Sequence, residues 1–189
     1  MPFKSQAFLL FLLLILLASY SLRAEDIAPL SVTVLFSPED DCGRRILQCI
    51  EGAKESMELA IYHITSRPLA QALVRAKERG VTVRVFIDGD NADDQYSKAT
   101  YLKRSGLDVL TEKGVGLMHN KFCIIDDKIV ITGSFNWTNS ADLKNDENLL
   151  IIESEKIARK YRLQFEKYWL GTYKDESYYV NRNSLEKMK

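Results

Sequence analysis

The 189-residue sequence is poor in the residues that mark repetitive or disordered chains, with only 4 prolines and 9 glycines. Together with an apolar fraction of 46%, this scarcity excludes a low-complexity linker, a collagen-like repeat and a disordered tail protein. Net charge is absent as well, because 26 Lys and Arg balance 26 Asp and Glu. A neutral chain lacks the bulk positive charge of an architectural nucleic-acid binder, although it can still carry a local basic patch. The length suits one domain with its own core.

Cysteine is scarce too, and the three cysteines are an odd number that leaves at least one unpaired. Cys42 and Cys49 lie seven residues apart in a helical pattern, which separates their Cα atoms by about 10 Å, beyond the reach of a disulfide. They could pair only if the helix begins after Cys42. Together with His63 they also lack the short ligand spacing of zinc sites. We therefore expect the cysteines to be small core residues.

One long apolar run stands near the N-terminus, where twelve apolar residues, 7–18, follow Lys4. As a helix this run would be about 18 Å long, against about 30 Å for a bilayer core. The pattern favours a cleaved secretory signal over residues 1–24, and an uncleaved N-terminal anchor is the alternative. Either reading predicts an exported protein, periplasmic or secreted. Removing residues 1–24 takes away Lys4 and Arg23, so 24 basic residues face 26 acidic ones and the net charge becomes −2.

The first part of the chain alternates between strand and helix patterns. Strands are predicted at 32–36, 57–62, 81–87 and 107–110, with helices between them, the last over residues 95–105. The even spacing of the first three strands is typical of a parallel sheet with helical crossovers. Sheets of this kind bind ligands at the carboxyl ends of their strands.

The second part predicts a hairpin of strands 121–125 and 129–132, a strand over 148–153 and a long amphipathic helix over 156–169. No composition shift marks a second domain. We expect a single α/β domain over residues 27–171, with a mixed, mostly parallel sheet flanked by helices. A polar, tyrosine-rich tail follows over residues 172–189.

One of only two histidines, His119, opens a motif of chemistry-bearing residues. His119, Lys121 and Asp126 form the pattern H-x-K-x4-D, and Gly133-Ser134-Phe135-Asn136 follows seven residues later. This set resembles the phospholipase D superfamily, whose HKD motif H-x-K-x4-D is followed by G-S-x-N. The resemblance is to its small single-motif members, the bacterial endonucleases and the Zucchini-type phosphodiesterases, and extends over roughly residues 32–171. It implies the phospholipase D-like fold and phosphodiester chemistry.

Strand geometry agrees with the resemblance, because residues two apart in a strand share a face. His119 and Lys121 should therefore project into one site, whereas Asp126 should face away and hold the hairpin. Ser134 and Asn136 also share parity. An imidazole, an ammonium, a hydroxyl and a carboxamide in one cleft suit an anionic phosphate. We expect Lys121 and Asn136 to hold its non-bridging oxygens, with Ser134 as a further phosphate contact.

The resemblance implies that one histidine attacks phosphorus to form a phosphohistidine, while a second protonates the leaving oxygen. Glu147 fits as the carboxylate that orients His119. Neither a metal nor another cofactor is needed, because the charge is handled by Lys121 and Asn136. The second histidine would come from a symmetric homodimer with a shared active site. His63, just past a predicted strand, is the alternative acid within one chain.

The substrate is less well defined than the reaction. We expect an endonuclease acting on DNA or RNA, because the chain is short and resembles the single-motif bacterial endonucleases. A phospholipase D acting on phospholipid head groups is the rival, because such a site accepts any accessible phosphodiester. A phosphate-binding module with an inactive site is a third reading.

Overall fold

The computed structural model describes residues 30–112 and 116–172. The predicted leader over residues 1–24 and nearly all of the polar tail therefore lie outside the described residues. Within the described residues, the helices and strands from Ser31 to Trp169 belong to one compact unit. Among the described residues, no helix is both long and apolar enough to cross a bilayer.

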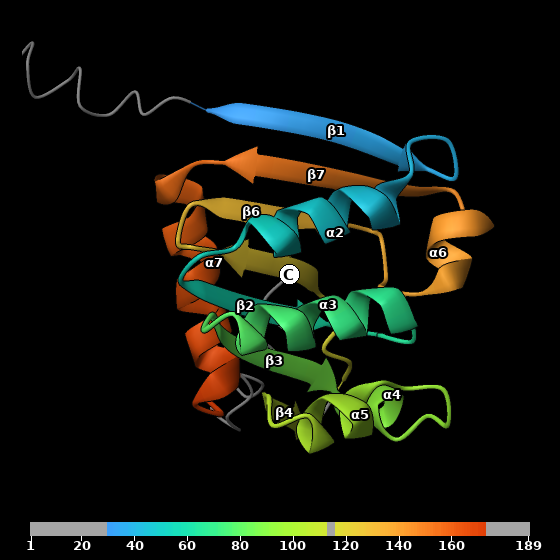
Figure 1. Cartoon of the computed structure of the whole chain (residues 1–189), viewed down its shortest axis with the longest axis vertical. Coiled ribbons are helices and arrows are strands. Elements are labelled where there is room, and N and C mark those ends of the chain that lie inside the picture. The colour runs from blue at the N-terminus through green and yellow to red at the C-terminus, as the bar shows by residue number, and fades with distance from the viewer. Residues whose placement is uncertain (1–29, 113–115, 173–189) are drawn as a thin grey trace, which may run out of the picture. The chain divides into compact units, whose positions relative to one another are not determined.

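Seven strands form one sheet in the order β1-β7-β6-β5-β2-β3-β4 (Figure 1). The strands are β1 (Ser31–Ser37), β2 (Ser56–Ile61), β3 (Thr82–Asp88), β4 (Asp108–Glu112), β5 (Lys121–Ile125), β6 (Ile129–Gly133) and β7 (Glu147–Glu153). Each lies within two residues of its predicted position. The α/β fold with a mixed sheet and flanking helices is confirmed.

The predicted dominance of parallel pairing is wrong. Only β2·β3 and β3·β4 pair in parallel, whereas β1·β7, β7·β6, β6·β5 and β5·β2 are antiparallel. β1, β2 and β3 do run in one direction, as predicted from the helices between them. Four successive antiparallel pairs lead from β1 to β2, which gives these two strands the same direction, and β3 is parallel to β2. However, β5, β6 and β7 lie between β1 and β2, so β1 has only an antiparallel neighbour. Local patterns report strand direction, but sheet order depends on which distant strands pair.

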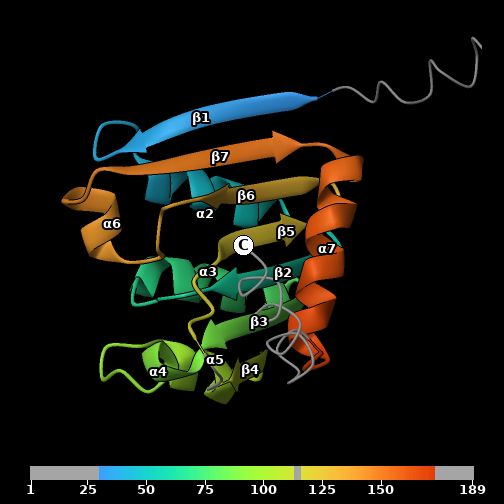
Figure 2. The same ribbon diagram turned by 180° about the vertical axis from the view of Figure 1, so that it is seen from behind.

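The described residues form six helices around the sheet: α2 (Cys42–Gly52), α3 (Arg67–Glu78), α4 (Gly89–Ala92), α5 (Ala99–Arg104), α6 (Asn139–Leu143) and α7 (Glu155–Trp169). α2 and α3 pack on one face (Figure 1), and α7 crosses the other (Figure 2). A larger hydrophobic cluster fills the α2–α3 side, and a smaller aromatic-rich cluster lies under α7. The sheet is therefore sandwiched between two helical layers.

The predicted helix over residues 95–105 is shorter than expected and begins at Ala99. The side chain of Asp94 accepts a hydrogen bond from the Tyr96 amide at 2.8 Å, and the Lys98 amide donates to the Ile64 carbonyl at 3.0 Å. These backbone groups are therefore committed to a turn before the helix starts. Two further helices, α4 and α6, were not predicted, because four and five residues are too few to show a helical period.

The cysteines follow the expectation drawn from their spacing. α2 begins at Cys42, so Cys42 and Cys49 stand in one helix, and all three cysteines are unpaired. Cys42 and Cys123 are buried in the larger core. Burial raises the pKa of Cys42 to about 11, and the nearby carboxylate of Asp142 adds to the rise. A neutral thiol suits a core position.

Candidate functional site

The predicted site residues gather at one edge of the sheet. β2 and β3 end there at Ile61 and Asp88, while the antiparallel strands β5 and β7 begin there at Lys121 and Glu147. The register confirms this arrangement, because Ile61 pairs with both Ile87 and Lys121. At this edge the carboxyl ends of the parallel strands β2 and β3 lie beside the first residues of the antiparallel strands β5 and β7. Lys121 and Glu147 are those first residues.

Lys121 and His119 meet at the start of β5. The Lys121 side chain is only 8% exposed, and its Nζ donates a hydrogen bond to the backbone carbonyl of His119 at 2.7 Å. Burial lowers the pKa of Lys121, against a smaller rise caused by the charge of Glu147. The His119 residue is exposed, whereas the ammonium that contacts its backbone carbonyl is buried.

Tyr62, the residue after β2, contacts both groups. Its ring centroid lies 4.4 Å from that of His119 and 4.8 Å from Nζ of Lys121. Its backbone amide donates to the carbonyl of Asn120 at 2.9 Å. The aromatic face therefore supports the imidazole and also attracts the ammonium through a cation–π contact.

Two hydrogen bonds outside the motif hold the segment that carries it. The buried carboxylate of Asp88, at the end of β3, accepts a bond from the backbone amide of Met118 at 2.9 Å. The side chain of Asn120 donates to the hydroxyl of Tyr168 on α7 at 2.6 Å. His119 is thus fixed on both sides, by β3 before it and by α7 after it.

Ser134 and Glu147 are joined directly. The Ser134 hydroxyl donates to Glu147 Oε2 at 2.5 Å and accepts from the Asn148 amide at 3.0 Å. The other Glu147 oxygen accepts from the Asn145 side chain at 3.0 Å. Among the described residues, the hydrogen bonds to the Glu147 carboxylate come from Ser134 and Asn145, and the predicted bond between Glu147 and His119 is not formed. For Ser134 to donate to a phosphate, its hydroxyl must first leave Glu147.

Gly133 makes the close approach between β6 and β7 possible. It has a φ of +146°, and a Cβ at this position would lie 2.2 Å from the Asn148 carbonyl oxygen. Only glycine tolerates both conditions. The glycine of the G-S-x-N pattern is therefore required by the backbone that places Ser134.

Two polar atoms near this edge are buried without a hydrogen-bond partner. They are Oδ1 of Asn136 and Nε2 of His63, the latter 4.0 Å from Asp94 Oδ1. An unpaired buried polar atom costs free energy that a ligand group can offset. The carboxamide of Asn136 makes no side-chain bond within the described part of the chain, which leaves it available to a ligand.

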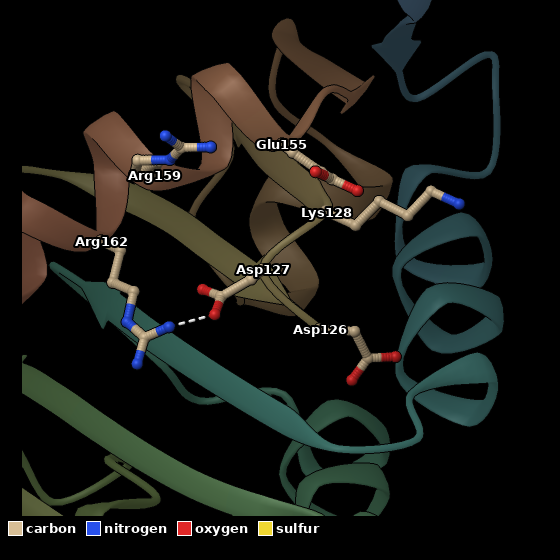
Figure 3. Close-up of a pocket in the computed structure, with 6 residues that line it drawn as sticks. All are labelled: Asp126, Asp127, Lys128, Glu155, Arg159 and Arg162. Carbon is tan, nitrogen blue, oxygen red and sulfur yellow. Dashed lines mark hydrogen bonds and ion pairs between the residues drawn. The ribbon is translucent and has the colours of Figure 1, made fainter. Parts of the chain in front are cut away.

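Asp126 lies at the opposite end of β5, at the turn of the hairpin. Its carboxylate accepts hydrogen bonds from the backbone amides of Lys54, Glu55 and Ser56 at 2.8 to 3.2 Å. Burial acts to raise the pKa of Asp126, but these amides lower it below its ordinary value. Figure 3 shows Asp126 in a pocket with Asp127 and Arg162, which form an ion pair. None of the other motif residues lines this pocket.

Sequence reasoning missed the roles of Asp88, Tyr62 and Tyr168. The first two follow the carboxyl ends of strands, the region where ligands were expected, so their positions carried a usable signal. Tyr168 carried none, because its contact with Asn120 joins residues 48 positions apart. Among the described residues, no group of three or more His, Cys, Asp or Glu side chains is arranged to hold a metal ion.

Comparison with known proteins agrees with this geometry. The sequence profile of the family described as "Cardiolipin synthase, PLD-like domain" matches residues 46–169. A phospholipase D of Rickettsia conorii is 38% identical over 148 residues, which cover 77% of this chain and 74% of that protein. The mitochondrial cardiolipin hydrolase of Mus musculus is 38% identical over 125 residues, covering 66% of this chain and 57% of that protein.

A solved structure is similar over most of its length. Nuc of Salmonella typhimurium, described as a phospholipase D family member, superposes with a TM-score of 0.71 at 35% identity. The match covers 74% of this chain and 94% of that chain. The profile, the relatives and the solved structure therefore indicate one family.

Proposed function

Because the chain belongs to the phospholipase D superfamily of phosphodiesterases, we propose that it cleaves phosphodiesters without a metal, through a phosphohistidine on His119. The observation that carries this mechanism is the placement of the buried Lys121 ammonium against the backbone carbonyl of the exposed His119, with the Tyr62 ring in contact with both side chains. A phosphate that meets the ring also meets the positive charge. The charge that builds on its oxygens in the transition state is therefore stabilised where it forms.

In the first step, a ring nitrogen of His119 bonds to phosphorus while the bond from phosphorus to the leaving oxygen breaks. A second imidazole gives its proton to that oxygen. In the second step, water loses a proton to the same imidazole and displaces His119 from phosphorus. Lys121 and the Nδ2 group of Asn136 donate hydrogen bonds to the non-bridging oxygens. Glu147 supports the site through Ser134 and through its charge near Lys121.

The proposal takes the second imidazole from another copy of the chain, in a homodimer that shares its active site. The chain has one HKD motif, and His119 is exposed at the sheet edge. A twofold axis beside this edge would bring two His119 rings to one phosphate. His63 remains the alternative acid, because its Nε2 has no hydrogen-bond partner and lies 4.0 Å from Asp94 Oδ1.

We infer a nucleic acid as the substrate, with export through the N-terminal apolar run as part of the proposal. The support is the resemblance to small bacterial endonucleases and the likeness to Nuc over 94% of that chain. The alternative is a phospholipid head group, which is favoured by relatives named phospholipase D and mitochondrial cardiolipin hydrolase. Both substrates present the same diester to Lys121 and His119.

One experiment separates these possibilities. The purified chain is incubated in the presence of EDTA in two parallel reactions, one with plasmid DNA and one with phosphatidylcholine vesicles. After quenching, each reaction is tested for an acid-labile phosphoenzyme. We expect nicked plasmid in EDTA and a phosphoenzyme that His119→Ala cannot form. Activity that EDTA removes and Mg²⁺ or Zn²⁺ restores would overturn the mechanism. Released choline with intact plasmid would select the phospholipase, and binding without turnover would indicate an inactive phosphate-binding module.

A further inference from the structure

The edge strand β1 leaves an apolar row open to solvent. Val32, Val34 and Phe36 are 45%, 52% and 55% exposed. They alternate with Leu35, which packs in the core on the α2 side, so they point to the opposite face of the sheet. There Val32 pairs with Ile152, a member of the cluster under α7. Exposed apolar rows on edge strands usually indicate a contact surface.

α7 lies on the same face of the sheet (Figure 2), and its exposed residues form a mostly positive stripe. The exposed residues of α7 are Glu155, Lys156, Arg159, Lys160, Leu163 and Lys167, and Leu170, which follows the helix, is exposed too. Arg162 is not part of this stripe because it pairs with Asp127 (Figure 3), and Glu166 pairs with Arg84 at 2.6 Å. The stripe therefore contains the cations Lys156, Arg159, Lys160 and Lys167 and the acid Glu155, in a chain whose total charge is zero.

A groove of about 560 Å³ lies between this helix and the start of β5. Lys160 and Lys167 line it together with Phe122, Tyr161 and Leu163. Leu163 is 64% exposed, so an apolar side chain stands in the middle of the positive stripe. The groove also reaches Asn120, the residue between His119 and Lys121. Positive and apolar groups thus meet beside the catalytic segment.

We propose that these residues form a docking surface for a bilayer that contains anionic phospholipids. The surface consists of Val32, Val34 and Phe36 of β1 with Lys156, Arg159, Lys160, Leu163 and Lys167 of α7. Cations attract anionic head groups, and apolar side chains enter the boundary between head groups and acyl chains. A nucleic acid would use the cations but leave the β1 row and Leu163 in water. The combination of cations with exposed apolar side chains therefore favours a lipid surface over a nucleic acid as the partner. This docking proposal does not depend on whether the catalytic site cleaves a nucleic acid or a phospholipid.

The test is flotation of the full chain with vesicles of phosphatidylcholine alone or mixed with phosphatidylglycerol. We expect tighter binding to the mixed vesicles, with the difference falling as salt rises. The double variant Lys160→Glu/Lys167→Glu should weaken binding to mixed vesicles at least about thirtyfold, since each cation near an anionic surface contributes about a factor of five. The apolar run of residues 7–18 is present in every variant, so it does not affect this comparison.

The matched control is Lys103→Glu/Arg104→Glu, which reverses two exposed charges on α5. α5 packs into the core on the α2–α3 side through Ala99 and Leu102, so this variant should bind like the wild type. Turnover of a small soluble phosphodiester should be unchanged in both variants, which shows that they are folded. Val34→Ser/Phe36→Ser should weaken binding while keeping the preference for anionic vesicles.

Three results would overturn the proposal. Equal binding to the two kinds of vesicle would remove the electrostatic part. Loss of DNA binding in the α7 variant, with vesicle binding intact, would assign the stripe to nucleic acid. A halved solution mass of the β1 variant, with vesicle binding intact, would assign the apolar row to contact with a second copy of the chain.

Discussion

Tyr62 and His119 are in ring contact, with centroids 4.4 Å apart and planes inclined by 59°. The same tyrosine ring faces Nζ of Lys121 at 4.8 Å. One side chain from the end of β2 therefore positions two reactive groups from the start of β5. A cation–π contact of this kind contributes about 0.5 to 2 kcal/mol, more where water is excluded.

We predict that Tyr62→Leu lowers kcat about tenfold, equivalent to about 1.4 kcal/mol, because the imidazole and the ammonium both lose their aromatic support. Tyr62→Phe keeps the ring and should retain most of the activity. The measurement is steady-state turnover of a soluble diester, with thermal unfolding as the control for stability. A Leu variant with the kcat of the wild type would show that the ring has no positioning role.

His119→Ala and Lys121→Ala should each abolish turnover while the fold persists. The first removes the nucleophile, and the second removes the positive charge behind it. Glu147→Gln should lose less, because Glu147 acts through Ser134 rather than on the phosphate. Rates are compared with circular dichroism spectra of each variant. Near wild-type turnover in the His119 or Lys121 variant would refute the assignment.

The dimer and the single-chain alternative give opposite results for His63. If a second copy supplies the acid, the chain should have the mass of two subunits in solution and His63→Ala should keep most of its activity. Light scattering and turnover decide the matter together. A fully active monomer, or a folded but inactive His63→Ala protein, would instead assign the acid to His63.

Asp126→Asn should destabilise the fold by about 2 kcal/mol near neutral pH, because a charged acceptor for three backbone amides is lost. The pKa of Asp126 is lower in the folded chain than its ordinary value of about 3.9. Its contribution is therefore fully present above the ordinary value and disappears as the pH falls through the folded value. Denaturant unfolding from pH 7 to pH 2 measures this.

The exposed Asp108 on β4 provides a matched substitution, because Asp108→Asn should change stability little at any pH. In Asp126→Asn, activity should fall only as far as the melting temperature explains. A loss of turnover well below the melting temperature would mean that Asp126 acts on the reaction itself.

Gly133→Ala should destabilise the protein by about 3 kcal/mol and disturb Ser134. The new Cβ would lie 2.2 Å from the Asn148 carbonyl at a φ of +146°, so clash and backbone strain both contribute. Gly80→Ala is the control, because Gly80 has a φ of +94° with nothing within 4 Å of a Cβ. It should cost only the strain, about 1 kcal/mol. Equal unfolding free energies for the two variants would argue against the clash.

The sequence was sufficient for local features such as the positions of the strands. Apolar runs predicted β5 and β6, and residue parity predicted that His119 and Lys121 project to one side. Sheet order was not accessible, since nothing near β1 indicates that its partner is β7, more than a hundred residues later. The link between Ser134 and Glu147 was missed for a similar reason, because it depends on how β6 and β7 pair.

The four residues between Lys121 and Asp126 in the H-x-K-x4-D pattern are the body of β5, which ends at Ile125. The two ends of the motif therefore serve different edges of the sheet, chemistry at one and anchorage to Lys54–Ser56 at the other. One inserted residue would turn either Lys121 or Asp126 to the wrong face. The x4 spacing therefore sets the length of β5. It fixes the distance between Lys121 in the site and Asp126, which is anchored to the backbone of Lys54–Ser56.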